Sequence, residues 1–301
     1  MNSARRAVLA ALLALFWPGV FAVPARATTA TAECLEAPSR ILRRPVGYCA
    51  ILPPGYRADK AQHYPVLYLL HGLGENQTVL IRSGALNLVQ DLWDSGRAGK
   101  FLIVTPDAGS SFYINSQNGR ERYEDFFIRE FLPFIARRYR VRPGRTNRGI
   151  AGLSMGGYGA LHLAFRYPQL FGSVGAESAA LIERLPSVTV AGPESHAFRR
   201  ALGGAFGSPP DPAFWAKNSP LTLARTARLS GLKIYFDCGR QDNYGFYRGA
   251  EALDRILTTR RIPHEFHLYP GGHDWIYFAA HLPGLLQFES NAFGLAHASP
   301  R

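Results

Sequence analysis

The stretch Gly149-Ile150-Ala151-Gly152-Leu153-Ser154-Met155-Gly156-Gly157-Tyr158-Gly159 decides the fold. It runs from an apolar strand end through the pattern Gly-x-Ser-x-Gly into a helix rich in alanine and leucine, which is typical of a nucleophile elbow. The turn is so sharp that Ser154 must take a strained backbone conformation, and Gly152 and Gly156 allow the strand and helix to approach without Cβ clashes. The elbow lifts the Ser154 hydroxyl above the sheet edge and points the Met155 N–H toward the space where an oxyanion would form. A glycine-rich turn with an incidental serine is the alternative interpretation.

Continuous apolar runs on either side of the elbow predict buried strands. Residues 64–70 and 101–107 show no alternation of polar and apolar side chains, as expected of strands covered on both faces. Further strands are predicted at 171–176, 232–236 and 264–269, with helical patterns between them. This alternation predicts a mostly parallel central sheet flanked by helices. Pro133 should kink the predicted helix from Tyr123 to Tyr139.

The first 27 residues do not belong to this domain. Arg5 and Arg6 precede an apolar run that ends before Ala25-Arg26-Ala27, which is a small-x-small cleavage site. We therefore predict a signal peptide over residues 1–27 and a single domain over residues 28–301, in a secreted or periplasmic protein. An N-terminal membrane anchor is the alternative, although Pro18 and Gly19 interrupt the run. No second stretch is apolar enough to span a bilayer, so no stable membrane insertion is expected.

The distribution of the basic residues argues against a nucleic-acid partner. Removal of the leader takes away three arginines and no acid, and lowers the formal charge from +12 to +9. The remaining arginines are scattered and lack the interleaved aromatic residues of a nucleic-acid platform. We interpret them as a solvated basic surface that can touch anionic polymers of the cell envelope.

Three cysteines remain after export, in a compartment that permits disulfides. Cys34 and Cys49 lie at equal distances from the midpoint of Ile41 and Leu42, so a hairpin would place them opposite one another. We predict a bridge between these two and a free thiol at Cys238.

Two loops and one long segment are candidates for the site. His71-Gly72-Leu73-Gly74 follows a buried strand, where an α/β-hydrolase supplies its second oxyanion donor, and the Leu73 N–H is our candidate. A plain strand-ending turn is the alternative. The loop with Phe112, Tyr113 and Asn115 either lines the pocket or packs its aromatic rings beneath the surface. Residues 177–230 are rich in proline and glycine, contain no predicted strand, and suggest a cap-like insertion over the carboxyl edge of the sheet.

Three residues supply acyl-transfer chemistry in the order serine, aspartate, histidine. Ser154, Asp242 and His273 each lie on a loop after a predicted strand, and a parallel sheet brings such loops to one edge. The serine needs a base to take its proton, and the base needs an acid to fix its tautomer. Asp237 also follows a strand, but it directly adjoins the strand end, whereas Asp242 has the greater reach. Asp274 is too close to His273 in the chain to bond its Nδ1.

The motifs Pro65-Val66-Leu67-Tyr68-Leu69-Leu70-His71-Gly72, Gly152-Leu153-Ser154-Met155-Gly156-Gly157 and Pro270-Gly271-Gly272-His273-Asp274-Trp275 carry a family resemblance. From about Ser39 to Phe288 the chain resembles the esterase family of α/β-hydrolases. That family includes esterase D (S-formylglutathione hydrolase), feruloyl and acetylxylan esterases, tributyrin esterases and the mycobacterial antigen mycolyltransferases.

The resemblance implies an α/β-hydrolase fold, no metal or organic cofactor, and hydrolysis of a small-molecule or polysaccharide-linked ester through an acyl-enzyme. It assigns Ser154 as nucleophile, His273 as base, Asp242 as acid, and Leu73 and Met155 as oxyanion donors. The signal peptide departs from the cytosolic role of esterase D. Transfer of the acyl group to a sugar or envelope acceptor remains an alternative, as does a catalytically inactive exported binding protein. The acyl group, the alcohol, the choice between periplasm and exterior, and the oligomeric state stay open.

Overall fold

An eight-stranded sheet forms the centre of the molecule, shown in a computed structural model that describes residues 29–185 and 194–295. The strand order is β1-β2-β4-β3-β5-β6-β7-β8, and the strands from β4 to β8 in this order are parallel to one another. β1 and β2 form the antiparallel side of the sheet. The mostly parallel sheet expected from the sequence is therefore confirmed. The strands are β1 (Thr31–Ala37), β2 (Val46–Leu52), β3 (Val66–Leu70), β4 (Leu102–Pro106), β5 (Arg148–Leu153), β6 (Ser173–Glu177), β7 (Lys233–Gly239) and β8 (Glu265–Tyr269).

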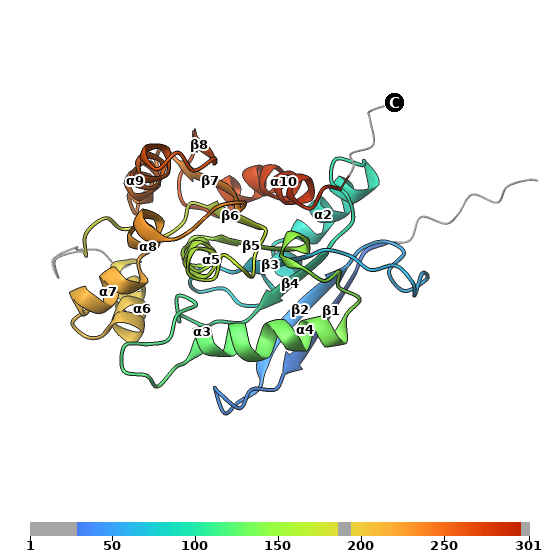
Figure 1. Cartoon of the computed structure of the whole chain (residues 1–301), viewed down its shortest axis with the longest axis horizontal. Coiled ribbons are helices and arrows are strands. Elements are labelled where there is room, and N and C mark those ends of the chain that lie inside the picture. Colours follow the sequence, from blue (N-terminus) through green and yellow to red (C-terminus); the bar gives the residue numbers. More distant parts are fainter. Residues whose placement is uncertain (1–28, 186–193, 296–301) are drawn as a thin grey trace, which may run out of the picture.

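Helices cover both faces of this sheet (Figure 1). Alternate residues of β3 enter two separate apolar clusters, Val66 and Tyr68 with α5 on one face, and Leu67 and Leu69 with α2 and α10 on the other. Burial on both faces explains why the strand shows no alternation of polarity. Within the described ranges, no helix is long and apolar enough to cross a membrane. The α-helices are α1 (Val79–Arg82), α2 (Ala85–Asp94), α3 (Tyr123–Phe126), α4 (Leu132–Arg138), α5 (Met155–Arg166), α6 (Glu194–Phe206), α7 (Pro212–Asn218), α8 (Pro220–Thr226), α9 (Phe246–Thr259) and α10 (Trp275–Ala292).

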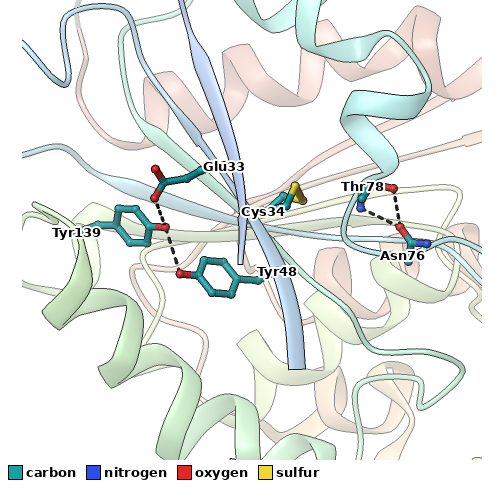
Figure 2. The surroundings of a disulfide bond; sticks show 7 residues. Glu33, Cys34, Tyr48, Asn76, Thr78 and Tyr139 are labelled. Carbon is teal, nitrogen blue, oxygen red and sulfur yellow. Dashed lines mark hydrogen bonds between the residues drawn. A yellow bond between two sulfur atoms is a disulfide. The ribbon is translucent and has the colours of Figure 1, made fainter. Parts of the chain in front are cut away.

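The N-terminal hairpin has the register predicted from its cysteines. Cys34 lies opposite Cys49 in the β1–β2 pair, and the two form a disulfide, whereas Cys238 is buried and unbridged. Beside the disulfide, the Tyr139 hydroxyl after α4 donates to Glu33 and shares a hydrogen bond with the Tyr48 hydroxyl (Figure 2). The hairpin is thus tied to the helix layer as well as to the sheet.

The segment from Tyr123 to Arg138 is helical, and it contains one irregular turn just before Pro133. A π-helical turn, η1 (Phe127–Phe131), joins α3 to α4, and Pro133 lies in the first turn of α4. The backbone is also helical at Phe131 and Leu132, so Pro133 lies inside a continuous helical segment, where its ring excludes a regular bond to the carbonyl four residues earlier. The π-turn lies directly before Pro133, and such turns are a usual site of helix kinks, so the kink stays a prediction.

The cap predicted over residues 177–230 is only partly a cap. Residues 186–193 lie outside the described part of the chain, and the rest forms α6, α7 and α8 after the last residue of β6. α7 and α8 pack along α5: the Tyr158 hydroxyl donates to the Asn218 carbonyl, and α8 contacts both α5 and α9. These two helices belong to the layer beside the sheet, whereas α6 brings Ala197 and Phe198 near Ser154 at the carboxyl edge. A proline at the start of α7 and of α8 explains why the segment looked irregular in sequence.

Candidate active site

The turn between β5 and α5 has the backbone of a nucleophile elbow. Ser154 has φ 55° and ψ −115°, a strained conformation for a residue with a side chain. A Cβ on Gly152 would collide with the backbone of Gly156, and a Cβ on Gly156 with the carbonyl of Leu70. The Ser154 N–H donates to the Glu177 carbonyl over 2.9 Å. Glycine at both positions is therefore a steric requirement of the turn.

Three side chains from separate loops meet at this edge. The Ser154 Oγ lies 2.8 Å from His273 Nε2, and His273 Nδ1 lies 2.7 Å from Asp242 Oδ2. Ser154 follows β5, Asp242 follows β7, and His273 follows β8, so the carboxyl ends of parallel strands deliver all three. A carboxylate that accepts from Nδ1 leaves Nε2 as the acceptor facing the serine hydroxyl. The arrangement can therefore move a proton from the serine to the imidazole.

Backbone N–H groups that follow Asp242 hold its second carboxylate oxygen, Oδ1. Asp242 is 4% exposed, and its Oδ1 accepts from the N–H of Tyr244 at 2.9 Å and from the N–H of Phe246 at 3.4 Å. The rings of Tyr244, Phe246 and Phe278 pack edge-on against His273 with centroid distances of 4.9 to 5.3 Å. The imidazole is thus held between one carboxylate and three aromatic rings.

The other two aspartates near the histidine have different partners. Asp237 accepts hydrogen bonds from the hydroxyls of Tyr235 at 2.9 Å and Tyr277 at 2.6 Å, beneath the site. Asp274 caps α10 by accepting from the Tyr277 N–H. Neither carboxylate is bonded to His273 in the structure.

Sequence reasoning missed a buried acid at the end of β6. Glu177 lies opposite Asp237 in the sheet register and is fully buried, and neither of its carboxylate oxygens has a hydrogen-bond partner within the described residues. Burial, with the Asp237 charge adding to it, raises the pKa of Glu177 well above its ordinary value. Burial also raises the pKa of Asp237 to about 6, against the opposing effect of its tyrosine hydrogen bonds. The signal available in the sequence was an acid directly after the small and apolar residues Val174, Gly175 and Ala176 of a buried strand.

The residues that carry the candidate oxyanion donors, Leu73 and Met155, line a cavity of about 440 Å³ together with the serine and the histidine. Met155 is the first residue of α5, so its N–H has no partner within the helix. Leu73 enters the cavity from the loop after β3. A larger hollow of about 930 Å³ lies at the amino ends of β7 and β8, away from these side chains. The described residues that line the smaller cavity are Gly72, Leu73, Gly74, Glu75, Val79, Leu153, Ser154, Met155, Ala197, Phe198, Tyr244, Phe246, His273, Asp274, Trp275 and Phe278.

The loop after β4 packs into the core and does not line this cavity. Phe112 and Tyr113 are fully buried, and Phe112 lies edge-on to Tyr158 and Phe206. Asn115 accepts from the backbone of α3. In the described part of the chain, no group of three or more His, Cys, Asp or Glu side chains is placed to hold a metal ion.

The strand order of the sheet, the elbow at Ser154 and the loops that place the three side chains together define the α/β-hydrolase fold. A family model described as "Putative esterase" matches residues 39–288, and the chain belongs to that family. Esterase Rv1288 of Mycobacterium tuberculosis is 30% identical over 246 residues, which are 75% of this chain and 52% of that protein. The chain thus spans about half the length of the first curated relatives it matches.

Two further relatives match over nearly their whole length. An acetyl esterase of Caldicellulosiruptor saccharolyticus is 27% identical, over 84% of this chain and 95% of that protein. Among solved structures, a ferulic acid esterase superposes with a TM-score of 0.75 at 29% identity and covers 89% of this chain and 100% of its own. The family resemblance drawn from the sequence motifs is confirmed by these matches.

Proposed function

We propose that this chain is an exported serine carboxylesterase that hydrolyses esters through an acyl-enzyme. The observation that carries the proposal is the continuous pair of hydrogen bonds from Asp242 through His273 to Ser154, at the edge of a cavity. Membership of the esterase family supports the same chemistry.

In the first half-reaction Ser154 Oγ attacks the ester carbonyl while its proton passes to Nε2 of His273. Asp242 accepts from Nδ1 and stabilises the imidazolium that forms. The carbonyl oxygen becomes an oxyanion, toward which the N–H groups of Leu73 and Met155 are directed in this proposal. His273 then gives its proton to the leaving alcohol, and the acyl group stays on the serine oxygen.

In the second half-reaction water takes the place of the alcohol. His273 accepts a proton from the water, whose oxygen attacks the acyl carbon, and the same two N–H groups stabilise the second oxyanion. Collapse of this intermediate releases the carboxylic acid and returns the proton to Ser154.

The cavity lining favours a neutral, apolar acyl group. Aromatic and aliphatic side chains such as Leu73, Phe198 and Phe278 supply most of its walls, and its charged lining residues are Glu75 and Asp274. No lysine or arginine occurs among the described residues that line it. An acyl group with a carboxylate of its own would meet like charge there.

Export rests on the leader predicted over residues 1–27, which lies outside the described residues. The Cys34–Cys49 bridge supports an oxidising compartment, because cytosolic thiols are kept reduced. The proposed mature protein is a single domain that begins at residue 28.

The test is Ser154→Ala, assayed with p-nitrophenyl esters of rising chain length, methyl ferulate and acetylated xylan. The variant should fold and lose nearly all hydrolysis, and a fluorophosphonate should label the wild-type protein at Ser154 alone. Labelling at another serine, or wild-type activity in the variant, would contradict the assignment. Product analysis with an added sugar acceptor distinguishes transfer from hydrolysis. A wild-type protein that neither hydrolyses nor transfers an acyl group would favour the inactive binding protein.

A further inference from the structure

A buried histidine sits directly behind the candidate oxyanion loop. His71 follows β3, is fully buried, and packs edge-on against the ring of Tyr113. Its Nε2 accepts from the Ala108 N–H at 2.9 Å. Asp107 Oδ1 lies farther from the same nitrogen, at 3.5 Å. Because the nearer partner of Nε2 is a backbone N–H, which can only donate, we place the imidazole proton of neutral His71 on Nδ1. That nitrogen lies 2.8 Å from the Gly72 carbonyl oxygen and donates to it.

The Gly72 carbonyl belongs to the same peptide group as the Leu73 N–H. The peptide bond is trans, so its C=O and N–H point in opposite directions, and fixing one direction fixes the other. The backbone N–H of Glu75 also donates to the Gly72 oxygen, over the longer distance of 3.2 Å. The imidazole bond therefore sets where the Leu73 N–H points.

The loop needs such a hold because its own sequence gives it little stiffness. Gly74 has φ +86° and no atom within 4 Å of the place where a Cβ would stand. The preceding carbonyl, that of His71, is held separately by the Tyr113 hydroxyl at 3.0 Å. A donor on the Gly72 carbonyl also polarises the peptide and strengthens its N–H as a donor.

We propose that His71, as the Nδ1-protonated neutral imidazole, is a positioning residue that aims the Leu73 N–H at the oxyanion. It does not touch the substrate, and it acts through the Gly72–Leu73 peptide. The inference rests on the proposed esterase function.

Two substitutions separate the two bonds of the ring. In His71→Asn the side-chain N–H reaches about as far as Nδ1 and keeps the donor to Gly72, but the acceptor for Ala108 is lost. In His71→Gln the side-chain oxygen reaches about as far as Nε2 and keeps the Ala108 bond, but the donor to Gly72 is lost. Loss of an oxyanion donor typically costs about 10² to 10³ in kcat. We expect kcat to fall about 10- to 100-fold in H71Q and less than fivefold in H71N, with KM within about twofold in both.

Binding of a transition-state analogue distinguishes positioning of the oxyanion donor from a purely structural role of His71. A trifluoromethyl ketone forms a tetrahedral adduct on the serine, so its affinity should fall in H71Q by the same factor as kcat/KM. Fluorophosphonate titration of Ser154 gives the concentration of folded sites, so partial unfolding does not enter kcat. His162→Gln is the matched control, because His162 is equally buried and binds Glu124 and Asn218 away from the cavity. That control should lower the melting temperature and leave kcat unchanged.

Equal kcat in H71N and H71Q, greater loss in H71N, or unchanged analogue affinity in H71Q would overturn the inference. The proposed function itself is refuted if the wild-type protein hydrolyses no ester or if Ser154→Ala keeps the activity. The His71 inference is refuted on its own when hydrolysis depends on Ser154 but not on the donor at position 71.

Discussion

Replacement of Asp242 by asparagine should invert the hydrogen bonding of His273 without moving it. Asp242 Oδ1 accepts from the Tyr244 N–H at 2.9 Å, and Oδ2 accepts from His273 Nδ1 at 2.7 Å. In Asp242→Asn the amide oxygen stays with the Tyr244 N–H, because the amide nitrogen cannot accept. The NH₂ group then faces Nδ1, which must become an acceptor, and the imidazole proton moves to Nε2. There it faces the Ser154 hydroxyl, and the serine can no longer pass its proton to the ring.

The expected cost is about 10⁴ in kcat, or about 5.5 kcal/mol of transition-state stabilisation. KM should change little, because Asp242 is not among the described residues that line the cavity. The assay is steady-state hydrolysis of a p-nitrophenyl ester, with circular dichroism to confirm the fold. Asp237→Asn is the matched control: its partners are the hydroxyls of Tyr235 and Tyr277, so it should act mainly on stability. A well-folded but inactive Asp237→Asn beside an active Asp242→Asn would refute the reasoning.

The remaining predictions concern stability and thiols. Asp237 has a raised pKa of about 6 and a fully buried acid beside it. The folded state therefore favours protonated Asp237, whose contribution to the free energy of unfolding is fully present below pH 3.8 and is lost as the pH rises through about 6. Glu177→Gln removes the neighbouring acid and should therefore raise the melting temperature at pH 8, by about 2–4 °C for each kcal/mol of destabilisation that the acid causes. The gain should be smaller at pH 5. An equal gain at both pH values would contradict this. Alkylation of the unfolded, non-reduced protein should modify Cys238 alone, and reduction of Cys34–Cys49, which spans 15 residues, should cost about 3 kcal/mol. Mass spectrometry that finds two or more free thiols would contradict the pairing.

The parts of the fold that depend on neighbouring residues in the chain could be predicted from the sequence. The apolar run at 64–70 has no polar alternation because β3 is covered on both faces, and the hairpin register follows from the equal spacing of Cys34 and Cys49 about its turn. The elbow needed only the two glycines that its geometry demands. In each case the sequence carries the physical constraint within one short, continuous stretch of the chain.

Features that depend on contacts distant in sequence were not predictable. Whether Phe112 and Tyr113 line a pocket or a core depends on α5 and α6, which pack against their loop. The ring of His71 has its partners at Gly72 and Ala108, and the second of these lies 37 residues away. Periodicity identifies a buried side chain in such cases, but the partners of that side chain come from tertiary packing.

The buried acids beneath the elbow show how a cost in stability can accompany the geometry of the site. The Ser154 N–H donates to the carbonyl of Glu177, and the N–H of Ser178 donates to the carbonyl of Asp237. The backbone that fixes the strained serine therefore belongs to the strand ends that carry the two acids. A neutral pair can occupy this position, whereas a doubly ionised pair would place like charges among buried side chains. Because the tyrosine hydroxyls favour the charged form of Asp237, Glu177 is the member that holds its proton longer.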